Sequence, residues 1–440
     1  MKRLLYLILL MLLAFSLAAC GGEEAEPADE EAGDTEEVTE VEETEEEADT
    51  EEAAAEELEC NDSIGCVEVA PGEPIRIASA LVVSGPNTDL GIDSQYGVEI
   101  ALDKRGELLG HPLELQAEDE GCSAEGGQTA AQKIVSDPTI VGVIGTSCSG
   151  AGVPASQVIA DAGYLMISPS NTAPVLTDPE QRNAGYFRTA HNDLIQGRAM
   201  AVFALDELGV TSAAAIHDGD PYTEGLATAF SDAFEELGGE IVAFEAEDPN
   251  ATNVSPVLTT VAAAGPPELI YYPVFIPLGP NLTQQARDIE GLEDADLAGA
   301  DGLISPSFLE AAGEAALGMY ISGPDLGFEN EEYDDFVQRY QDAYGSEPLS
   351  AFHAHAYDAT NMLLNAIEEV AIVGDDGTVL IPRQALRDAV AATEGHQGIT
   401  GTLTCDQYGD CADPRISVNE IQETDEGLDY VSIWEYVPEE

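Results

Sequence analysis

From residue 74 onward, short apolar runs alternate with longer segments whose apolar positions recur every three or four residues. The short runs predict strands, and the longer segments predict helices. In the first part of the chain this pattern gives strand 75–83, helix 92–105, strand 113–117, a helix ending near 135, strand 139–145, helix 153–162 and strand 164–167. Strands that alternate with helices predict parallel sheets with right-handed crossovers.

A second alternating series follows residue 189. It predicts helix 194–208, strand 212–217, helix 223–237, strand 240–244, helix 254–263, strand 269–272, helix 282–289 and strand 297–300, then helices 331–344, 352–370 and 382–392 and a strand near 430–434. The 440 residues suffice for two sizeable domains. We therefore predict two α/β units with doubly wound parallel sheets, and expect the chain to return to the first unit near 318–322.

Small polar residues follow two neighbouring predicted strands. Ser149 leaves strand 139–145 at the N-terminus of the next helix, and Ser170 and Thr172 leave strand 164–167. The carboxyl edge of a parallel sheet is where open α/β folds bind ligands, and free N–H groups at a helix N-terminus favour an anion. A small carboxylate would fit such a pocket, although each turn by itself could be an ordinary polar loop.

The N-terminus resembles a bacterial lipoprotein signal. Lys2 and Arg3 precede the apolar run 4–17, and the small residues before Cys20 are typical of a cleavage site at which that cysteine is acylated. A plain signal peptide or a spanning helix is the alternative, but the run is short for a span. Residues 23–59 are mostly Glu, Asp, Ala, Thr and Gly, which predicts an extended tether within the segment 20–59 that follows signal residues 1–19.

Charge and cysteine content narrow the function further. The chain has 14 Lys plus Arg against 86 Asp plus Glu, a net charge of −72, so it lacks the clustered cations that nucleic acid binding needs. If Cys20 carries lipid, six cysteines remain, in close or plausible pairs: Cys60 with Cys66, Cys122 with Cys148, and Cys405 with Cys411. Disulfides are favoured outside the membrane, although six cysteines allow 15 connectivities. Zinc is less favoured because there is no Cys-x-x-Cys pair.

Eight motifs, taken in order, resemble those of one protein family. They are SGPNTDLG (84–91), VIGTSCSGAGVPAS (143–156), LMISPSNTAP (165–174), FRTAHNDLIQG (187–197), HDGDPYTEGLA (217–227), GADG (299–302), AFHAHAYDA (351–359) and GTLTCDQYGD (401–410). From about 74 to 436 the chain resembles the type I periplasmic solute-binding proteins of branched-chain amino acid ABC transporters, the leucine/isoleucine/valine-binding protein group. The resemblance implies two lobes that close on a ligand.

The same resemblance implies how the chain divides. Lobe one is expected to comprise 74–189 and 320–404, and lobe two 190–319 and 412–440. Three crossovers, near 188–190, 320–323 and 400–405, would join the lobes. The family also shares the Cys122 to Cys148 pairing, which would clamp the turn that carries Ser149.

The resemblance further implies the residues that bind the ligand. Ser149, Ser170 and Thr172 match positions that hold the α-carboxylate and amine, and Asp301 matches an acidic residue that balances the ammonium. Leu90, Tyr222, Phe275 and Phe352 match positions that line the rest of the pocket or its rim.

Departures from the family pattern bear on the ligand. Relatives often carry tyrosine at the positions of Leu90 and Phe275, so this cleft is more apolar and suits an aliphatic or aromatic side chain. Asp218 and Asp220, close to Tyr222, are rivals of Asp301 for the ammonium.

The residues do not favour catalysis. Ser149, His217 and Asp301 do not predict a hydrolase, because the serine and histidine would lie on opposite lobes and no Gly-x-Ser-x-Gly elbow is present. A binding module for an amide, a urea-like compound or a small organic acid, or a sensor acting with a membrane partner, is the alternative. We expect a lipid-anchored, exported monomer without enzymatic activity, cofactor or metal that delivers an amino acid, with a branched-chain or other apolar type favoured, to ABC permease subunits.

Overall fold

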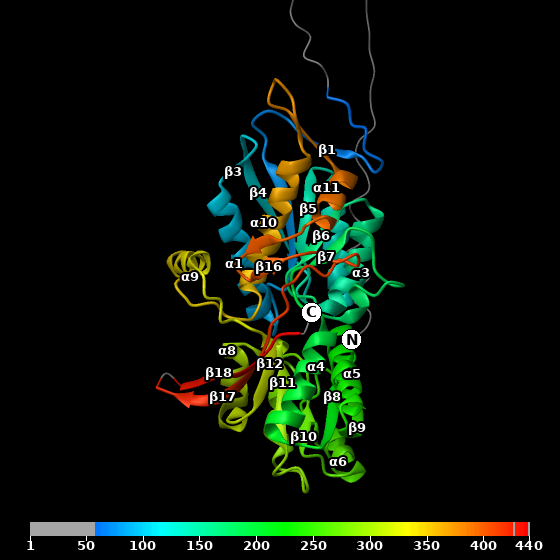
Figure 1. Cartoon of the computed structure of the whole chain (residues 1–440), viewed down its shortest axis with the longest axis vertical. Coiled ribbons are helices and arrows are strands. Elements are labelled where there is room, and N and C mark those ends of the chain that lie inside the picture. Colours follow the sequence, from blue (N-terminus) through cyan, green and yellow to red (C-terminus); the bar gives the residue numbers. More distant parts are fainter. Residues whose placement is uncertain (1–57, 426, 439–440) are drawn as a thin grey trace, which may run out of the picture. The chain divides into compact units, whose positions relative to one another are not determined.

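A computed structural model describes residues 58–425 and 427–438, and folds them into two α/β lobes (Figure 1). The predicted signal segment, Cys20 and nearly all of the acidic tether lie outside the described residues. Within the described residues, no helix has both the length and the apolar character needed to span a membrane. The blue, cyan and orange parts of the chain and the yellow helix at 331–344 belong to one lobe, and most of the green and red parts build the other.

Lobe one is built on a six-stranded sheet. Its order is β3 (Glu107–Leu108), β4 (His111–Asp119), β2 (Ile75–Leu81), β5 (Ile140–Gly145), β6 (Leu165–Ser168) and β7 (Tyr186–Arg188). All neighbours pair in parallel except β3 and β4. Six helices belong to this lobe: α1 (Thr88–Arg105), α2 (Ala124–Val135), α3 (Ser149–Asp161), α9 (Glu331–Tyr344), α10 (His353–Val370) and α11 (Arg383–Ala391).

The alternation of side chains along β2 places a hydrophobic core on each face of this sheet. Ile75 and Ile77 pack with residues of α1 and α10, while Ala78 and Ala80 pack with residues of α2 and α3. Successive side chains of a strand point to opposite faces, so a strand covered on both sides is apolar throughout. Because all strands of this sheet except β3 run parallel, their carboxyl ends lie at one edge of the lobe.

Lobe two is built on a seven-stranded mixed sheet. Its order is β18 (Gly427–Tyr436), β17 (Ile416–Thr424), β12 (Tyr320–Pro324), β11 (Asp296–Ala300), β10 (Leu269–Tyr271), β8 (Ser212–His217) and β9 (Glu240–Ala246). The strands from β12 to β9 are parallel, and β17 and β18 are antiparallel additions. Its helices are α4 (Asp193–Phe203), continued by a π-helical turn to Leu208, α5 (Pro221–Glu236), α6 (Ser255–Ala264), α7 (Gly279–Ala286) and α8 (Pro306–Ala312).

The fold class is as predicted, but one segment lies in the other lobe. Strand β12, expected in lobe one, pairs with β11 and β17 of the second sheet. The chain therefore returns to lobe one after Pro324 rather than at 320–323. The third crossover likewise follows β16 (Gly401–Leu403), a hairpin strand, and the loop closed by the Cys405–Cys411 disulfide. It ends at Arg415, whose carbonyl oxygen accepts a hydrogen bond from Asp325 N–H.

The sequence pattern missed several elements. Strand β17 was not expected, and α3 begins at Ser149, four residues before the predicted start at 153. A small sheet of β1 (Cys66–Val69), β14 (Val379–Pro382) and β13 (Ile372–Val373) joins the start of the described chain to lobe one. Each missed strand is short or strongly polar, so its pattern is weak without knowledge of its partner.

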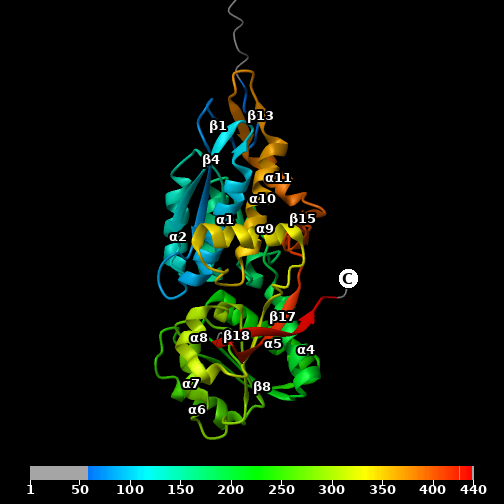
Figure 2. The same ribbon diagram turned by 90° about the vertical axis from the view of Figure 1, so that its left-hand side faces the viewer.

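The two lobes lie one beyond the other along the long axis (Figure 2), and side chains of both meet at their interface. The apolar core of lobe two continues into Val82, Leu90 and Cys148 of lobe one. Across the same interface, Asp89 of α1 accepts hydrogen bonds from the hydroxyls of Ser305 and Ser307 at the start of α8. Apolar and polar contacts therefore both join the lobes.

Candidate functional site

The first predicted turn lies at the N-terminus of α3. Ser149 is the first residue of the helix and is buried; its hydroxyl oxygen accepts a hydrogen bond from the backbone N–H of Ala173, at 3.3 Å. The preceding Cys148 is bonded to Cys122, and its N–H donates to the carboxylate of Glu120 at 3.1 Å. The disulfide and the Glu120 carboxyl thus fix the turn that carries Ser149.

The second predicted turn, after β6, lies against the first. Ser170 donates its hydroxyl proton to the Ser147 carbonyl at 2.8 Å, so its side chain ties the two turns together. The hydroxyl of Thr172 is buried and forms no hydrogen bond of normal geometry with a protein group. The fold therefore brings the three predicted lobe-one residues to one edge of the sheet, with Thr172 the least satisfied of them.

Asp301 of lobe two is buried among polar partners. It follows β11, and its Oδ1 accepts hydrogen bonds from Gln196 Nε2 at 2.8 Å and from the Tyr222 hydroxyl at 3.1 Å. The Tyr222 hydroxyl in turn accepts from Gly302 N–H at 3.1 Å. Burial raises the pKa of the Asp301 carboxyl to about 6, although these hydrogen bonds lower it in part. Two residues predicted for the site are thus joined directly.

Asp193, the first residue of α4, was missed by sequence reasoning. It is fully buried, and neither carboxyl oxygen forms a hydrogen bond of normal geometry with the protein. Burial first, and the nearby charge of Asp301 second, raise its pKa well above the ordinary value, while the Thr172 hydroxyl lowers it in part. The sequence signal was weak, because an acidic residue in the first turn of a helix is usually explained by the helix dipole.

The four predicted apolar or aromatic residues lie in one cluster. Leu90, Tyr222, Phe275 and Phe352 all belong to the core that crosses the lobe interface. The rings of Tyr222 and Phe275 are 5.1 Å apart between centroids, in a tilted arrangement. Phe275 and Leu90 are each 8% exposed, so neither side chain stands free at a rim.

Asp220 links the two lobes. Its Oδ1 accepts a hydrogen bond from Tyr222 N–H at 2.9 Å, which caps α5. Its other oxygen lies directly over Gly150 in the first turn of α3, so that a Cβ at Gly150 would be 2.0 Å from it. One carboxylate therefore meets the N-termini of two helices, one from each lobe, and only glycine leaves room for this approach.

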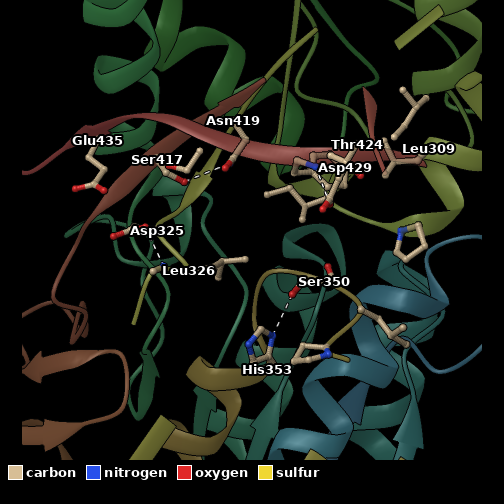
Figure 3. A pocket seen from close by; sticks show the side chains of 18 of the residues that line it. Leu309, Asp325, Leu326, Ser350, His353, Ser417, Asn419, Thr424, Asp429 and Glu435 are labelled. Atoms are coloured by element: carbon tan, nitrogen blue, oxygen red, sulfur yellow. Dashed lines mark hydrogen bonds between the residues drawn. The ribbon is translucent and has the colours of Figure 1, made fainter. Parts of the chain in front are cut away.

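Two cavities of substantial size are each lined by described residues of both lobes. One of about 430 Å³ is lined by Phe275 and also by Asn87, Asp218 and Asp220. Figure 3 shows the other, of about 660 Å³, which contains none of the eight predicted ligand residues. It is bordered by the β17–β18 hairpin and by His353, whose Nδ1 lies 3.0 Å from the Ser350 carbonyl oxygen. None of the polar groups described above lines this cavity.

The cysteine pairs are as predicted. Cys60 is bonded to Cys66, Cys122 to Cys148, and Cys405 to Cys411. In the part of the chain that the structure describes, no group of three or more His, Cys, Asp or Glu side chains is placed to hold a metal ion.

Residues 74–409 match the sequence profile of a family described as periplasmic binding protein. The chain belongs to this family. A Leu/Ile/Val-binding protein homologue from Brucella melitensis is 28% identical to this binding protein over 347 residues, which are 78% of this chain and 90% of the relative. The resemblance noted from the sequence motifs is confirmed.

Solved structures agree with the fold of this binding protein. A leucine-binding protein from Thermotoga maritima is 25% identical, with a TM-score of 0.73 over 83% of this chain and 99% of that one. A solute-binding protein from R. palustris, solved with 4-hydroxybenzoate, is 17% identical, with a TM-score of 0.71 over 83% of this chain and 97% of that one. The second likeness shows the shared fold alone.

Proposed function

We propose that this protein is the extracytoplasmic substrate-binding component of an ABC importer and that it captures an amino acid between its two lobes. The observation that carries the proposal is the group of buried polar side chains at the lobe interface: Asp301, Asp193 and Thr172. Relatives that match most of the chain are named for leucine, isoleucine and valine, which supports an amino acid ligand. No catalysis is required of this site.

The ammonium of the ligand is assigned to the two carboxylates. Asp301 and Asp193 are buried without a lysine or arginine side chain in an ion pair with either, among the described residues. A buried charge is stable only when it is paired or neutralised. An ammonium donates three hydrogen bonds, and Asp193, Asp301 and the Thr172 hydroxyl supply three acceptors.

The carboxylate of the ligand is assigned to the turns of lobe one. The α3 N-terminus and the hydroxyl of Ser149 lie at the carboxyl edge of the sheet, where a helix dipole favours a negative group. Leu90, Tyr222, Phe275 and Phe352 supply apolar surface for the carbon skeleton. A ligand that touches both lobes favours the closed state, and closure is the signal a permease can read.

The location of the protein is part of the proposal. Family membership implies export. Acylation of Cys20, followed by the acidic segment up to residue 59, would tether the folded lobes to a membrane while leaving them free to meet ABC permease subunits. We infer a monomer in this arrangement, because each ligand site is completed by the two lobes of one chain.

Calorimetry with the purified mature protein tests the ligand class. The panel contains amino acids, the corresponding amides and simple carboxylic acids. We expect binding of an amino acid, and weaker binding of the analogues, because an acid without an ammonium leaves Asp193 and Asp301 unpaired in the closed site. Asp301→Ala should weaken amino acid binding by about 2 to 5 kcal/mol, the usual cost of removing one partner of a buried pair.

Asp376→Ala is the control variant. Asp376 accepts hydrogen bonds from the N–H and hydroxyl of Thr378 in an exposed turn of lobe one. Its loss should leave affinity unchanged. Tighter binding of an uncharged amide or of a small organic acid than of every amino acid would instead support the alternative ligand classes and would overturn the proposal.

A further inference from the structure

The 430 Å³ cavity is shared by the two lobes and adjoins the proposed ligand site. Lobe one contributes Ser84 and Asn87, which follow β2, and lobe two contributes Asp218, Asp220 and Phe275. Its volume falls within the range of small-molecule pockets, about 300 to 1,000 Å³. The cavity can therefore hold part of a ligand rather than only a few water molecules.

The polar groups of this cavity include two carboxylates and one unpartnered amide oxygen. The Asn87 side chain is 9% exposed, and its buried Oδ1 has no hydrogen-bond partner. Asp218 accepts through Oδ1 from the Thr223 hydroxyl at 2.6 Å and from Asp220 N–H at 3.1 Å. No lysine, arginine or histidine is among the described residues that line the cavity. An unpartnered buried acceptor beside two carboxylates calls for a donor that carries positive charge.

Asp218 and Asp220 act on each other in the absence of such a donor. Burial first raises the pKa of Asp220, to about 6, and the charge of Asp218 adds to this effect, although the N–H groups of Tyr222 and Gly150 lower it. Asp193 also feels the charge of Asp220. A cation placed between the carboxylates would relieve this repulsion, because opposite charges a few ångströms apart favour the ionised form.

Phe275 connects the cavity to the proposed ammonium site. Its ring lines the cavity and lies 5.1 Å from the ring of Tyr222, whose hydroxyl donates to Asp301. A side chain that leaves the ligand's α-carbon near Asp301 and passes Phe275 therefore reaches Asp218 and Asp220. The stem of such a side chain would pack against the Phe275 ring, and its end would lie beside the carboxylates of Asp218 and Asp220.

We propose that this cavity binds the end of the ligand's side chain and selects an amino acid whose side chain is an aliphatic stem with a cationic nitrogen. The inference rests on the proposed function, because the ligand's α-ammonium and α-carboxylate fix its orientation in the cleft. It names the substrate class within the amino acids. A purely aliphatic ligand uses the same cleft but leaves Asn87 Oδ1 without a partner and the charges of Asp218 and Asp220 without a cation.

The test compares matched ligands by calorimetry on the mature protein. Lysine is paired with norleucine, which has the same four-carbon side chain but a hydrogen in place of the terminal ammonium group, and arginine with citrulline, its uncharged analogue. We expect the cationic member of at least one pair to bind about tenfold more tightly or better, the change expected from one charge-assisted hydrogen bond. Asp218→Asn keeps the acceptor for Thr223 and removes the charge, so it should reduce this preference.

Asp376→Asn is the control, because Asp376 accepts the same kind of turn hydrogen bonds outside the cavity, and it should leave the preference intact. Asp220→Asn should act as Asp218→Asn does, which guards against misfolding of a single variant. If norleucine binds as tightly as lysine and citrulline as tightly as arginine, or if the preference survives both variants, the cavity inference is wrong while the proposed function stands. If no amino acid binds, both fail.

Discussion

The substitution Asp301→Asn is expected to stabilise the ligand-free protein and to weaken ligand binding. In the ligand-free fold the Asp301 carboxyl is buried, and only Oδ1 accepts hydrogen bonds from other side chains, those of Gln196 and Tyr222. Asparagine retains an oxygen for both donors and removes the charge. The two effects have opposite signs because the charge is unfavourable until an ammonium arrives.

The size of the stabilisation follows from the pKa. Burial raises the pKa of Asp301 from its ordinary 3.8 to about 6, and this difference corresponds to about 3 kcal/mol, since each pH unit is worth about 1.4 kcal/mol. Below pH 3.8 the carboxyl is protonated in both folded and unfolded states, so it costs nothing. Between 3.8 and about 6 only the unfolded state ionises, and above about 6 the full cost is present.

Urea unfolding of the ligand-free wild type and Asp301→Asn at pH 7.5 and pH 4 measures this difference. The variant should have a free energy of unfolding higher by up to about 3 kcal/mol at pH 7.5, and most of that gain should vanish at pH 4. Calorimetry should show amino acid affinity lower by about 2 to 5 kcal/mol. A variant that is less stable at pH 7.5, or equally stabilised at both pH values, would refute the reasoning.

Three further predictions concern the scaffold. Non-reducing peptide mapping should recover Cys122 and Cys148 in one linked peptide, and replacing both with alanine should cost about 2 to 4 kcal/mol in urea unfolding; free thiols at both positions would contradict the pairing. Asp410→Ala should cost about 3 to 5 kcal/mol, because it strips the carboxylate from the fully buried Arg188 at the first passage between lobes, and a loss below about 1 kcal/mol would show that the pair is screened. Cys20→Ala should release the protein from membranes or block its maturation, and unchanged membrane fractionation would exclude the lipid anchor.

The sequence alone determined the fold class and most of the elements. The apolar alternation of β2 and the β5, α3, β6 series predicted parallel strands, because a strand covered on both faces must be apolar along its whole length. The motifs around Ser149, Thr172 and Asp301 placed these residues at strand ends, and parallel strands present such ends at one edge. The three cysteine pairs could also be predicted from the sequence, since two of them close short loops.

Only the tertiary structure decided which segments meet. The sequence of strand β12 is compatible with a buried strand in either lobe. It belongs to lobe two because it pairs with β11 and with β17, and β17 lies almost one hundred residues later in the sequence. Asp193 resembles an ordinary residue of a first helical turn in the sequence, whereas in the fold its carboxyl is fully buried beside Asp301. Asp218 and Asp220, sequence rivals for the ammonium, line a separate cavity with Asn87. The local sequence pattern indicates how polar a residue is. The chemistry of that residue depends on desolvation and on neighbouring groups, which only long-range packing supplies.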